Sequence, residues 1–315
     1  MKRKAIIISL SSTKLTNQEK NLFIKNTPWG VILFERNINS FSQTKNLINS
    51  IKKITKDKKY PVLIDEEGGT VTRLKNIFDN KPYSQRFFGK LYEIDKKSSI
   101  SLYVNYINSM CSFLKKIGIN INTVPVLDIL KKNTHKIIGN RSFSDKLSTI
   151  NKLSKICINT YTKNKIATVI KHIPGHGSAS DDSHKKLPFV RSPYKDLIKS
   201  DFACFKNSKS FFAMTAHIVY SKIDKNNVCT HSSYLIKKII RNKLKFKGLI
   251  ISDDISMKAL KHDLITNAKK SLLAGCNLTL YCAGNYKDSY NLLKEMPFID
   301  KFTVKKTSEL YSFLR

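Results

Sequence analysis

The fourteen residues 171–184 (KHIPGHGSASDDSH) hold three of the chain's seven histidines together with a carboxylate at Asp182. Pro174 and Gly175 separate His172 from His176, which argues against a helical i, i+4 pair of metal ligands. The segment follows an apolar run, residues 166–170, that is typical of a buried strand. Because α/β enzymes place titratable groups on loops after such strands, we expect this loop to carry chemistry rather than to be only a polar loop.

Two further carboxylates end apolar runs in the same way. Residues 248–252 predict a buried strand that delivers Asp253 at its carboxyl tip, where it could act as a nucleophile, a base or a metal ligand, with a helix starting directly after. A second strand ends on Asp65, and Arg73 can return to the same place after two glycines that permit close backbone approach. A carboxylate and a guanidinium suit recognition of sugar hydroxyls, although they could also form a structural salt bridge.

Nine of the 23 acidic residues follow or end predicted strands, which is where barrel enzymes build their sites. They are Asp65, Glu66, Glu67, Asp128, Asp181, Asp182, Asp224, Asp253 and Asp254. Some acids in such positions only cap helices or begin a first turn, and we interpret Asp128 and Asp254 in this way. We expect Asp224 to be a local cap or loop anchor.

The elements that must position these side chains alternate along the chain. Short apolar runs without strict alternation, typical of strands buried on both faces, occur at residues 4–10, 30–34, 61–65, 119–127, 166–170, 211–218, 248–252 and 277–281. Amphipathic helical patterns occur at residues 42–54, 98–116, 146–162, 194–206, 233–244, 257–273 and 286–294. This order predicts an α/β fold, a (β/α)8 TIM-type barrel, with residues 1–315 as a single catalytic domain. The alternative is an open doubly wound sheet, but no G-x-G-x-x-G follows the first strand.

The net charge of +34 raises a different hypothesis, a basic protein that binds nucleic acid or another anionic polymer. The lysines are spread along the whole chain, however, without a basic stripe interleaved with aromatic residues. We therefore interpret them as solvated helix faces that could still steer an anionic substrate, and we expect no nucleic-acid partner.

Compartment can also be inferred from composition. The six cysteines show neither a C-x-x-C pair nor a zinc spacing, and four of them lie in apolar runs, which favours a reducing compartment. No apolar stretch approaches the length of a membrane span, and the six-residue run after the basic start is too short for a signal peptide. We expect a cytoplasmic protein with no membrane partner.

Seven motifs occur in an order that resembles glycoside hydrolase family 3, and more closely its bacterial single-domain β-N-acetylglucosaminidases, the NagZ type. They are 30–37 (GVILFERN), 64–73 (IDEEGGTVTR), 122–128 (NTVPVLD), 138–145 (IGNRSFSD), 171–184 (KHIPGHGSASDDSH), 214–224 (MTAHIVYSKID) and 252–257 (SDDISM). The resemblance implies a retaining glycosidase that forms a covalent glycosyl-enzyme and needs neither cofactor nor metal.

The resemblance also implies roles for individual residues. Asp253 matches the nucleophile, and His184 matches the acid/base, with Asp182 as its carboxylate partner. Such a pair makes physical sense because histidine titrates near neutral pH and a carboxylate can orient its ring. The matched substrate-binding residues are Asp65, Arg73, Arg141, Lys171 and His172.

The remaining histidines carry weaker expectations. We expect His176 to be structural or to support the residues that contact the sugar, and His217 either to line the pocket or to pack as a buried histidine. His135, His231 and His262 lack a motif and are expected at the surface. Glu66 and Thr70 depart from the glutamine and arginine usual in the family motif, so Glu66 is expected to bring an extra charge near the sugar site.

The resemblance therefore predicts an exo-β-N-acetylglucosaminidase that removes terminal N-acetylglucosamine from peptidoglycan-derived anhydro-muropeptides in cell-wall recycling. Its partner is a small-molecule substrate, and we expect a monomer. A broader family 3 β-glucosidase is the nearer alternative, although those enzymes usually carry a second domain that supplies the acid/base carboxylate. A phosphorolytic variant is a further alternative, because a histidine repels an anionic acceptor less than a glutamate does.

Overall fold

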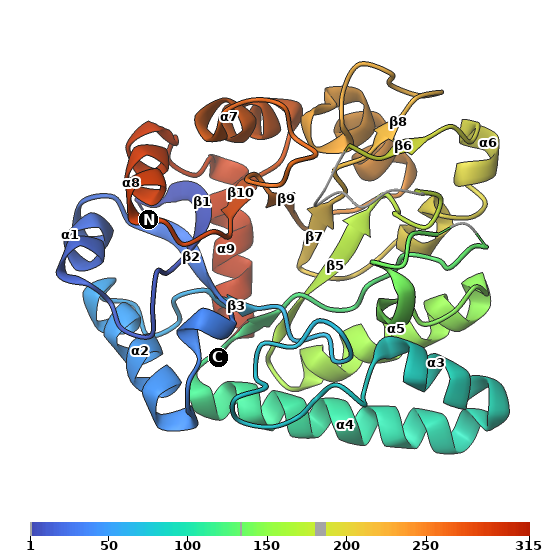
Figure 1. Cartoon of the computed structure of the whole chain (residues 1–315), viewed down its shortest axis with the longest axis horizontal. Helices are drawn as coiled ribbons and strands as arrows, with labels where there is room; N and C mark the ends of the chain where they lie inside the picture. Colours follow the sequence, from blue (N-terminus) through green and yellow to red (C-terminus); the bar gives the residue numbers. More distant parts are fainter. Residues whose placement is uncertain (1, 133, 180–186) are drawn as a thin grey trace.

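Eight parallel strands close into a barrel in the computed structural model, which describes residues 2–132, 134–179 and 187–315 (Figure 1). Around the barrel, the neighbours follow the order β1-β10-β9-β7-β5-β4-β3-β2. The strands are β1 (Lys4–Ser9), β2 (Pro28–Leu33), β3 (Val62–Ile64), β4 (Ile121–Asn122), β5 (Ala167–Ile173), β7 (Phe212–Thr215), β9 (Leu249–Asp254) and β10 (Leu278–Tyr281). Each of the eight predicted runs overlaps one of them, so the predicted (β/α)8 barrel is confirmed and the open sheet is wrong.

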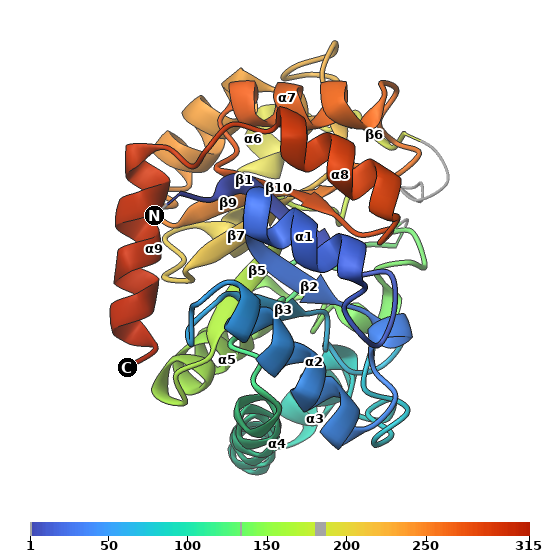
Figure 2. The ribbon, with the colours of Figure 1, turned by 90° about the vertical axis from the view of Figure 1, so that its left-hand side faces the viewer.

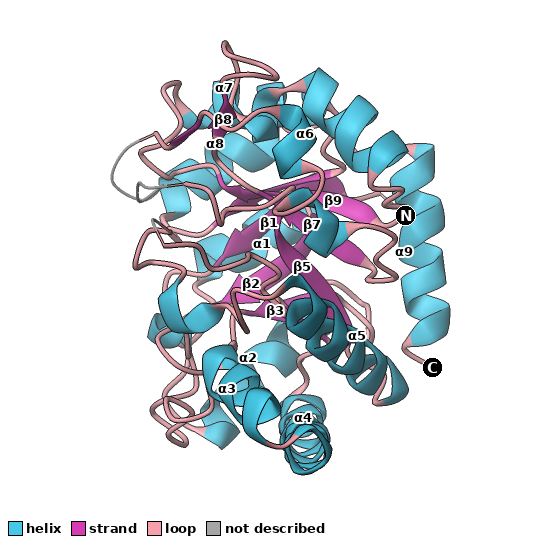
Figure 3. Cartoon of the chain, turned by 90° about the vertical axis from the view of Figure 1, so that its right-hand side faces the viewer, coloured by secondary structure: helices cyan, strands magenta, loops and turns pink. Residues whose placement is uncertain are grey.

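Helices surround the strands (Figure 3). They are α1 (Asn17–Lys25), α2 (Phe41–Ile54), α3 (Gln85–Ile94), α4 (Lys96–Ile117), α5 (Leu147–Lys163), α6 (Tyr194–Leu197), a π-helix (Leu235–Lys243), α7 (Leu264–Ala274), α8 (Tyr286–Glu295) and α9 (Lys301–Phe313). A small parallel pair, β6 (Phe189–Val190) with β8 (Val219–Tyr220), lies outside the barrel. Across the described ranges, none of these helices is long and apolar enough to cross a membrane.

Two of the predicted helices are wrong in extent. The pattern at 194–206 forms only α6 and a 3-10 turn, Phe202–Phe205, because tighter i→i+3 backbone hydrogen bonds, such as that from the Ala203 N–H to the Ser200 carbonyl, replace the α-helical ones. The pattern at 257–273 becomes helical only at Leu264, where the Asp263 side chain caps α7 by accepting the Thr266 N–H. The helix therefore does not follow Asp253 directly. Helices α1, α3 and α9 were not among the predicted elements.

The strands separate two hydrophobic clusters. Alternate residues such as Ile6, Ile8 and Val31 pack outward in the cluster that includes the helices. Their neighbours form an inner cluster, which contains Ile7 and Trp29. Such alternation follows from the two-residue period of a strand. Hydrophobic core therefore lies on both sides of the barrel wall.

Helix α9 covers the amino-terminal end of the barrel (Figure 2). Trp29 at the start of β2 donates from its indole N–H to the Thr307 hydroxyl at 2.9 Å, and Leu310 of α9 joins the inner cluster. A backbone hydrogen bond from the Ile299 N–H to the Arg3 carbonyl lies just before this helix. With that end closed, the carboxyl-terminal ends of the strands are left to form the pocket.

Candidate functional site

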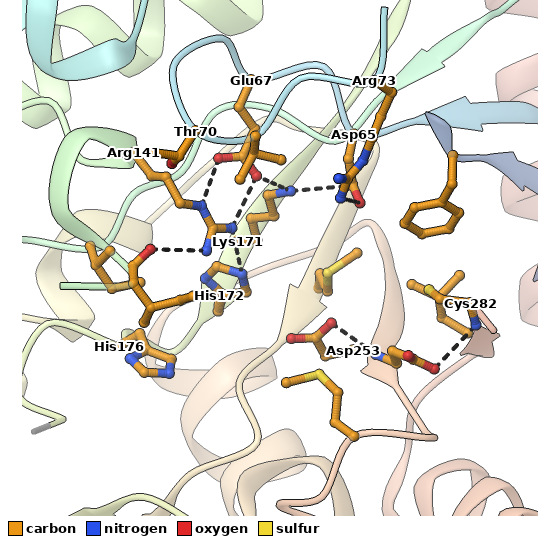
Figure 4. Close-up of a pocket in the computed structure, with 18 of the residues that line it drawn as sticks. Asp65, Glu67, Thr70, Arg73, Arg141, Lys171, His172, His176, Asp253 and Cys282 are labelled. Atoms are coloured by element: carbon orange, nitrogen blue, oxygen red, sulfur yellow. Dashed lines mark hydrogen bonds and ion pairs between the residues drawn. The ribbon is translucent and has the colours of Figure 1, made fainter. Parts of the chain in front are cut away.

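A pocket of about 360 Å³ opens at the carboxyl-terminal ends of the strands (Figure 4). Six of the sequence-predicted site residues line it, and they come from β5, β9 and the loops after β3 and β4: Asp65, Arg73, Arg141, Lys171, His172 and Asp253. The other two predicted residues, Asp182 and His184, lie outside the described residues. The strand ends thus gather groups that are up to 188 positions apart in the chain, Asp65 and Asp253.

Lys171 is the centre of an ionic network at the base of the pocket. Its ammonium lies 3.0 Å from Asp65 Oδ1, donates to the Thr123 hydroxyl at 2.8 Å and pairs with Glu67. The side chain is only 2% exposed, so these three partners replace the water that the charge has lost. The position follows from β5, whose last residues carry Lys171 past the end of the neighbouring strand β4.

Arg141 makes a two-pronged pair with Glu67. Its Nε and Nη2 donate to the two carboxylate oxygens at 2.8 and 3.0 Å, as in Figure 4. Burial alone would raise the pKa of Glu67, but Arg141 and Lys171 outweigh it and hold the pKa below its ordinary value. Glu67 was noted in the sequence only as one acid among nine, since nothing in the motif reveals which cations it meets.

Asp65 stays ionised because cations surround it. Burial would raise its pKa, yet Lys171, Arg73 and the Thr123 hydroxyl hold the pKa well below its usual range. Arg73 Nη2 lies 3.4 Å from Asp65 Oδ2, and its guanidinium stacks 4.9 Å from the centre of the Phe34 ring. The carboxylate and guanidinium are therefore both fixed at the pocket wall, as the sequence predicted.

Asp253 and Asp254 at the end of β9 have different environments. An oxygen of Asp253 accepts the Asp254 N–H at 2.8 Å, and the side chain faces the pocket in Figure 4. Asp254 instead accepts from the Ser256 hydroxyl at 2.6 Å and from the Cys282 N–H at 3.1 Å, and burial raises its pKa. Asp254 therefore fastens the turn after β9 to the end of β10. Its interpretation as a helix-capping acid is wrong, because it ends β9 and the next helix begins only at Leu264.

The structure corrects the expectation for Asp128. It caps no helix; its wholly buried carboxylate accepts the His172 Nδ1–H at 2.6 Å and the His176 peptide N–H at 2.7 Å. His176 is not only structural, because its ring lines the pocket beside His172. Burial lowers the pKa of His176 to about 4. The sequence underestimates the roles of Asp128 and His176, because it does not reveal which loop the Asp128 carboxylate contacts.

Glu66 also departs from expectation. Its carboxylate does not line the pocket but is buried behind it, where it accepts from the Thr72 hydroxyl at 2.7 Å and the Arg73 N–H at 2.7 Å. The Leu74 N–H and the Asn80 amide also donate to it. Burial raises its pKa in spite of these hydrogen bonds. The charge therefore organises the loop that carries Arg73 and adds nothing to the pocket wall.

The other histidines and Asp224 complete the list of candidates. His217 is fully buried away from the pocket, with its Nδ1 2.7 Å from the Thr230 hydroxyl and its Nε2 3.0 Å from the Asp254 carbonyl, so the packed interpretation holds. Asp224 anchors its loop through the Asn226 and Asn227 N–H groups and the Ser232 hydroxyl, as expected. His262 is exposed, whereas His135 and His231 are half-buried.

Asp201 anchors the first residues of the loop that follows β5, which we call the histidine loop (residues 174–184). Its buried carboxylate accepts from the Ser178 N–H at 2.7 Å and pairs with Lys131. Gly175 has a φ of +141° and lies so close to Asp201 that an added Cβ would stand 2.8 Å from the Asp201 Cβ. A Cβ at Gly177 would stand 2.2 Å from a backbone carbonyl, so only glycine fits there. Both glycines of the motif are therefore required by close packing.

The arrangement is suited to binding a neutral polyhydroxylated ligand. Alternating acceptors and donors, paired with one another, line one wall, and the Asp253 carboxylate lies across from them (Figure 4). Such paired charges can exchange partners with hydroxyl groups without leaving a buried charge unpaired. Within the described ranges, no group of three or more His, Cys, Asp or Glu side chains is arranged to hold a metal ion.

Comparisons with known proteins point to one family. The model of the glycosyl hydrolase family 3 N terminal domain matches residues 3–305. The chain is 31% identical over 283 residues to a beta-hexosaminidase of Glaesserella parasuis, covering 88% of this chain and 80% of that protein. It is also 31% identical over 284 residues to a beta-hexosaminidase of Haemophilus influenzae, with coverages of 88% and 79%.

A solved structure agrees with these relatives. NagZ from Neisseria gonorrhoeae, crystallised in complex with N-trifluoroacetyl-D-glucosamine, superposes with a TM-score of 0.87 at 26% identity. The match covers 100% of this chain and 91% of that one. The similarity therefore extends over the whole barrel and is not confined to the motifs.

Proposed function

The chain belongs to glycosyl hydrolase family 3 and is a β-N-acetylhexosaminidase, and from this premise we propose that it removes terminal N-acetylglucosamine from peptidoglycan-derived anhydro-muropeptides. We place this reaction in cell-wall recycling in the cytoplasm, carried out by a monomer. The resemblance of the sequence motifs to the NagZ type supports the choice of substrate.

The proposed nucleophile is Asp253, and its position is the observation that carries the mechanism. It ends strand β9 and faces a pocket whose opposite wall offers paired hydroxyl-binding groups. A sugar held there would expose its anomeric carbon to the carboxylate. An oxygen of Asp253 then attacks that carbon as the glycosidic bond breaks, which gives a covalent glycosyl-enzyme and retention after two inversions.

The proposed acid/base is His184, oriented by Asp182. In the first step His184 donates a proton to the departing glycosidic oxygen. In the second step it removes a proton from water, whose oxygen attacks the anomeric carbon and releases the Asp253 carboxylate. A neighbouring carboxylate would stabilise the protonated ring and fix its orientation. Asp201 supports this assignment, because it accepts the Ser178 N–H and so anchors the chain four residues before Asp182.

The proposed sugar-binding residues are the charged groups of the opposite wall. Asp65 would accept hydrogen bonds from hydroxyls, while Arg73, Arg141 and Lys171 would donate to them, and His172 would complete the set. The wholly buried Lys171 network closes the inner end of the pocket. A blind pocket of this kind accommodates a terminal sugar, which supports exo cleavage.

The direct test compares the hydrolysis of an aryl β-N-acetylglucosaminide with that of the matching aryl β-glucoside. We expect strong preference for the N-acetylglucosaminide and release of N-acetylglucosamine from the anhydro-muramyl disaccharide peptide. Equal or faster cleavage of the glucoside would contradict the proposal and indicate a broader β-glucosidase. Mass analysis of the released sugar in phosphate buffer separates hydrolysis from phosphorolysis, because phosphorolysis would yield N-acetylglucosamine 1-phosphate.

A further inference from the structure

Asp128 holds two histidines of the pocket although it does not line the pocket itself. It follows β4 and is only 1% exposed. Three donors surround its two oxygens: the His172 ring Nδ1 at 2.6 Å, the His172 peptide N–H at 3.3 Å and the His176 peptide N–H at 2.7 Å. Only a side chain that accepts hydrogen bonds with both of its terminal atoms can satisfy these three donors.

The other side of the His172 ring meets a group that can only donate. Arg141 Nη2 lies 3.3 Å from His172 Nε2, and a guanidinium has no acceptor atom. His172 Nε2 must therefore be the acceptor in this contact. The ring proton is then on Nδ1, where it points at Asp128. Arg141 is itself fixed by its two bonds to Glu67, so the ring is held between a carboxylate and a paired cation.

We propose that Asp128 is a positioning residue that fixes His172 as the Nδ1–H tautomer and so presents the Nε2 lone pair to the sugar pocket as an acceptor. The inference rests on the proposed sugar-binding function. A ligand that displaces the Arg141 contact must then bring a donor. N-acetylglucosamine offers hydroxyl groups and one acetamido N–H, and we assign the donor to a hydroxyl because His172 belongs to the proposed hydroxyl-binding residues. His172 thus selects a hydroxyl at one position of the ligand, and Asp128 determines that choice.

An asparagine cannot replace Asp128 in this role. Oδ1 meets the His176 N–H and Oδ2 meets the His172 Nδ1–H, so an amide NH2 at either place faces a donor. If the NH2 faces the His172 ring, Nδ1 must become the acceptor and the proton moves to Nε2, where it faces Arg141. The other amide orientation would oppose the His176 peptide N–H, which cannot move its proton as the ring can, so the orientation that changes the tautomer is favoured. A wrong histidine tautomer of this kind is known to cost an enzyme much of its rate.

The experiment measures inhibition constants for N-acetylglucosamine and its 3-, 4- and 6-deoxy-fluoro analogues, since fluorine cannot donate a hydrogen bond. Against the wild type, we expect the fluoro analogue at the position that His172 contacts to bind about tenfold more weakly, the worth of one hydrogen bond. In Asp128→Asn this penalty should fall below about threefold. A hydroxyl that Asp65 accepts would keep its penalty in both proteins. Asp224→Asn is the matched control, because Asp224 also accepts several donors but anchors a loop away from the pocket.

A second measurement reads the tautomer in the wild type itself. Long-range ¹H–¹⁵N correlations of ¹⁵N-histidine-labelled wild type report the tautomer directly, with His172→Gln used to assign the signal. We expect Nδ1–H for His172 near pH 7, with Nε2 unprotonated. A proton on Nε2, or unchanged discrimination in Asp128→Asn, would overturn the inference. Failure of the wild type to bind N-acetylglucosamine at all would instead contradict the proposed function.

Discussion

Neighbouring carboxylates in one strand end have separate tasks. Both line the pocket, but Asp254 holds the turn after β9 through the Ser256 hydroxyl and the Cys282 N–H, whereas Asp253 accepts the Asp254 N–H. This difference in environment, and not the sequence motif alone, distinguishes the proposed nucleophile from the structural acid.

Replacing Asp253 should therefore remove turnover without unfolding the chain. For Asp253→Ala, we expect no measurable hydrolysis of an aryl β-N-acetylglucosaminide, with a circular dichroism spectrum like that of the wild type. Asp254→Asn is the matched control and should be much milder, because it loosens a turn and leaves the attacking group in place. Near-normal activity of Asp253→Ala would refute the assignment.

At the residue scale, the sequence predicts the groups that belong to motifs and misses those defined by contact. Asp65, Arg73, Arg141, Lys171, His172 and Asp253 could be named in advance and do line one pocket. Asp128 is wrongly interpreted as a capping acid and Glu67 receives no role, because the function of each depends on buried partners that lie far away in the chain. Glu66 was misplaced for the same reason: the loop after Gly69 folds back over it and supplies four donors.

At the scale of elements, buried strands were the more predictable part. An apolar run bounded by polar residues has few alternatives inside an α/β barrel, so all eight strands could be located. Helix extents were less predictable because the same amphipathic pattern also fits tight turns. The 194–206 pattern forms α6 and a 3-10 turn joined by i→i+3 backbone hydrogen bonds.

The Asp201 anchor gives a prediction about the histidine loop. In Asp201→Asn, an amide NH2 would oppose either the Ser178 N–H or the Lys131 ammonium, so the loop base should shift. We expect kcat/KM to fall on the order of 10²-fold, the effect of a displacement of about 1 Å in a catalytic group. Steady-state kinetics with the unactivated disaccharide measures it. Asp224→Asn, which alters a loop anchor elsewhere, should change kcat/KM little, and an equal loss in both would contradict the link to the histidine loop.

At the scale of the whole molecule, the charge of +34 coexists with a pocket whose described charges are paired. Lysine and arginine outnumber acids in the chain, but in the pocket the carboxylates of Asp65 and Glu67 pair with Lys171 and Arg141. Stability should consequently depend less on surface pairs, which contribute little, than on buried titratable groups.

One such group predicts a loss of stability in mild acid. Burial lowers the pKa of His176 from 6.5 to about 4, so between these values the unfolded chain binds a proton that the folded protein does not. The contribution is fully present above pH 6.5 and is lost as the pH falls toward 4. From pH 7 to pH 5, this residue alone should lower the free energy of unfolding by about 2 kcal/mol.

Urea unfolding at the two pH values checks this prediction. His176→Asn should show a smaller acid loss than the wild type by roughly that amount, whereas His262→Asn, at an exposed position, should show the same loss as the wild type. An unchanged acid loss in His176→Asn would mean that the ring is not held neutral by burial.

The central claim is a covalent glycosyl-enzyme on Asp253 with His184 as acid/base. Without the histidine, activated aryl glycosides still form the intermediate because their leaving groups need little protonation. General acid–base assistance is worth roughly 10²–10⁴ in rate, so cleavage of the natural disaccharide should fall by that factor. Asp182→Asn should show a weaker form of the same defect, because His184 would remain but be poorly oriented.

Intact-mass measurement of His184→Ala, mixed with an activated aryl β-N-acetylglucosaminide, tests this claim most directly. Deglycosylation becomes limiting in that variant, so we predict an adduct of one N-acetylglucosaminyl group, located on Asp253 by peptide mapping and absent from the Asp253→Ala, His184→Ala double variant. Equal rate losses on good and poor leaving groups, with no adduct, would contradict the account and would mean that His184 only binds or positions the sugar.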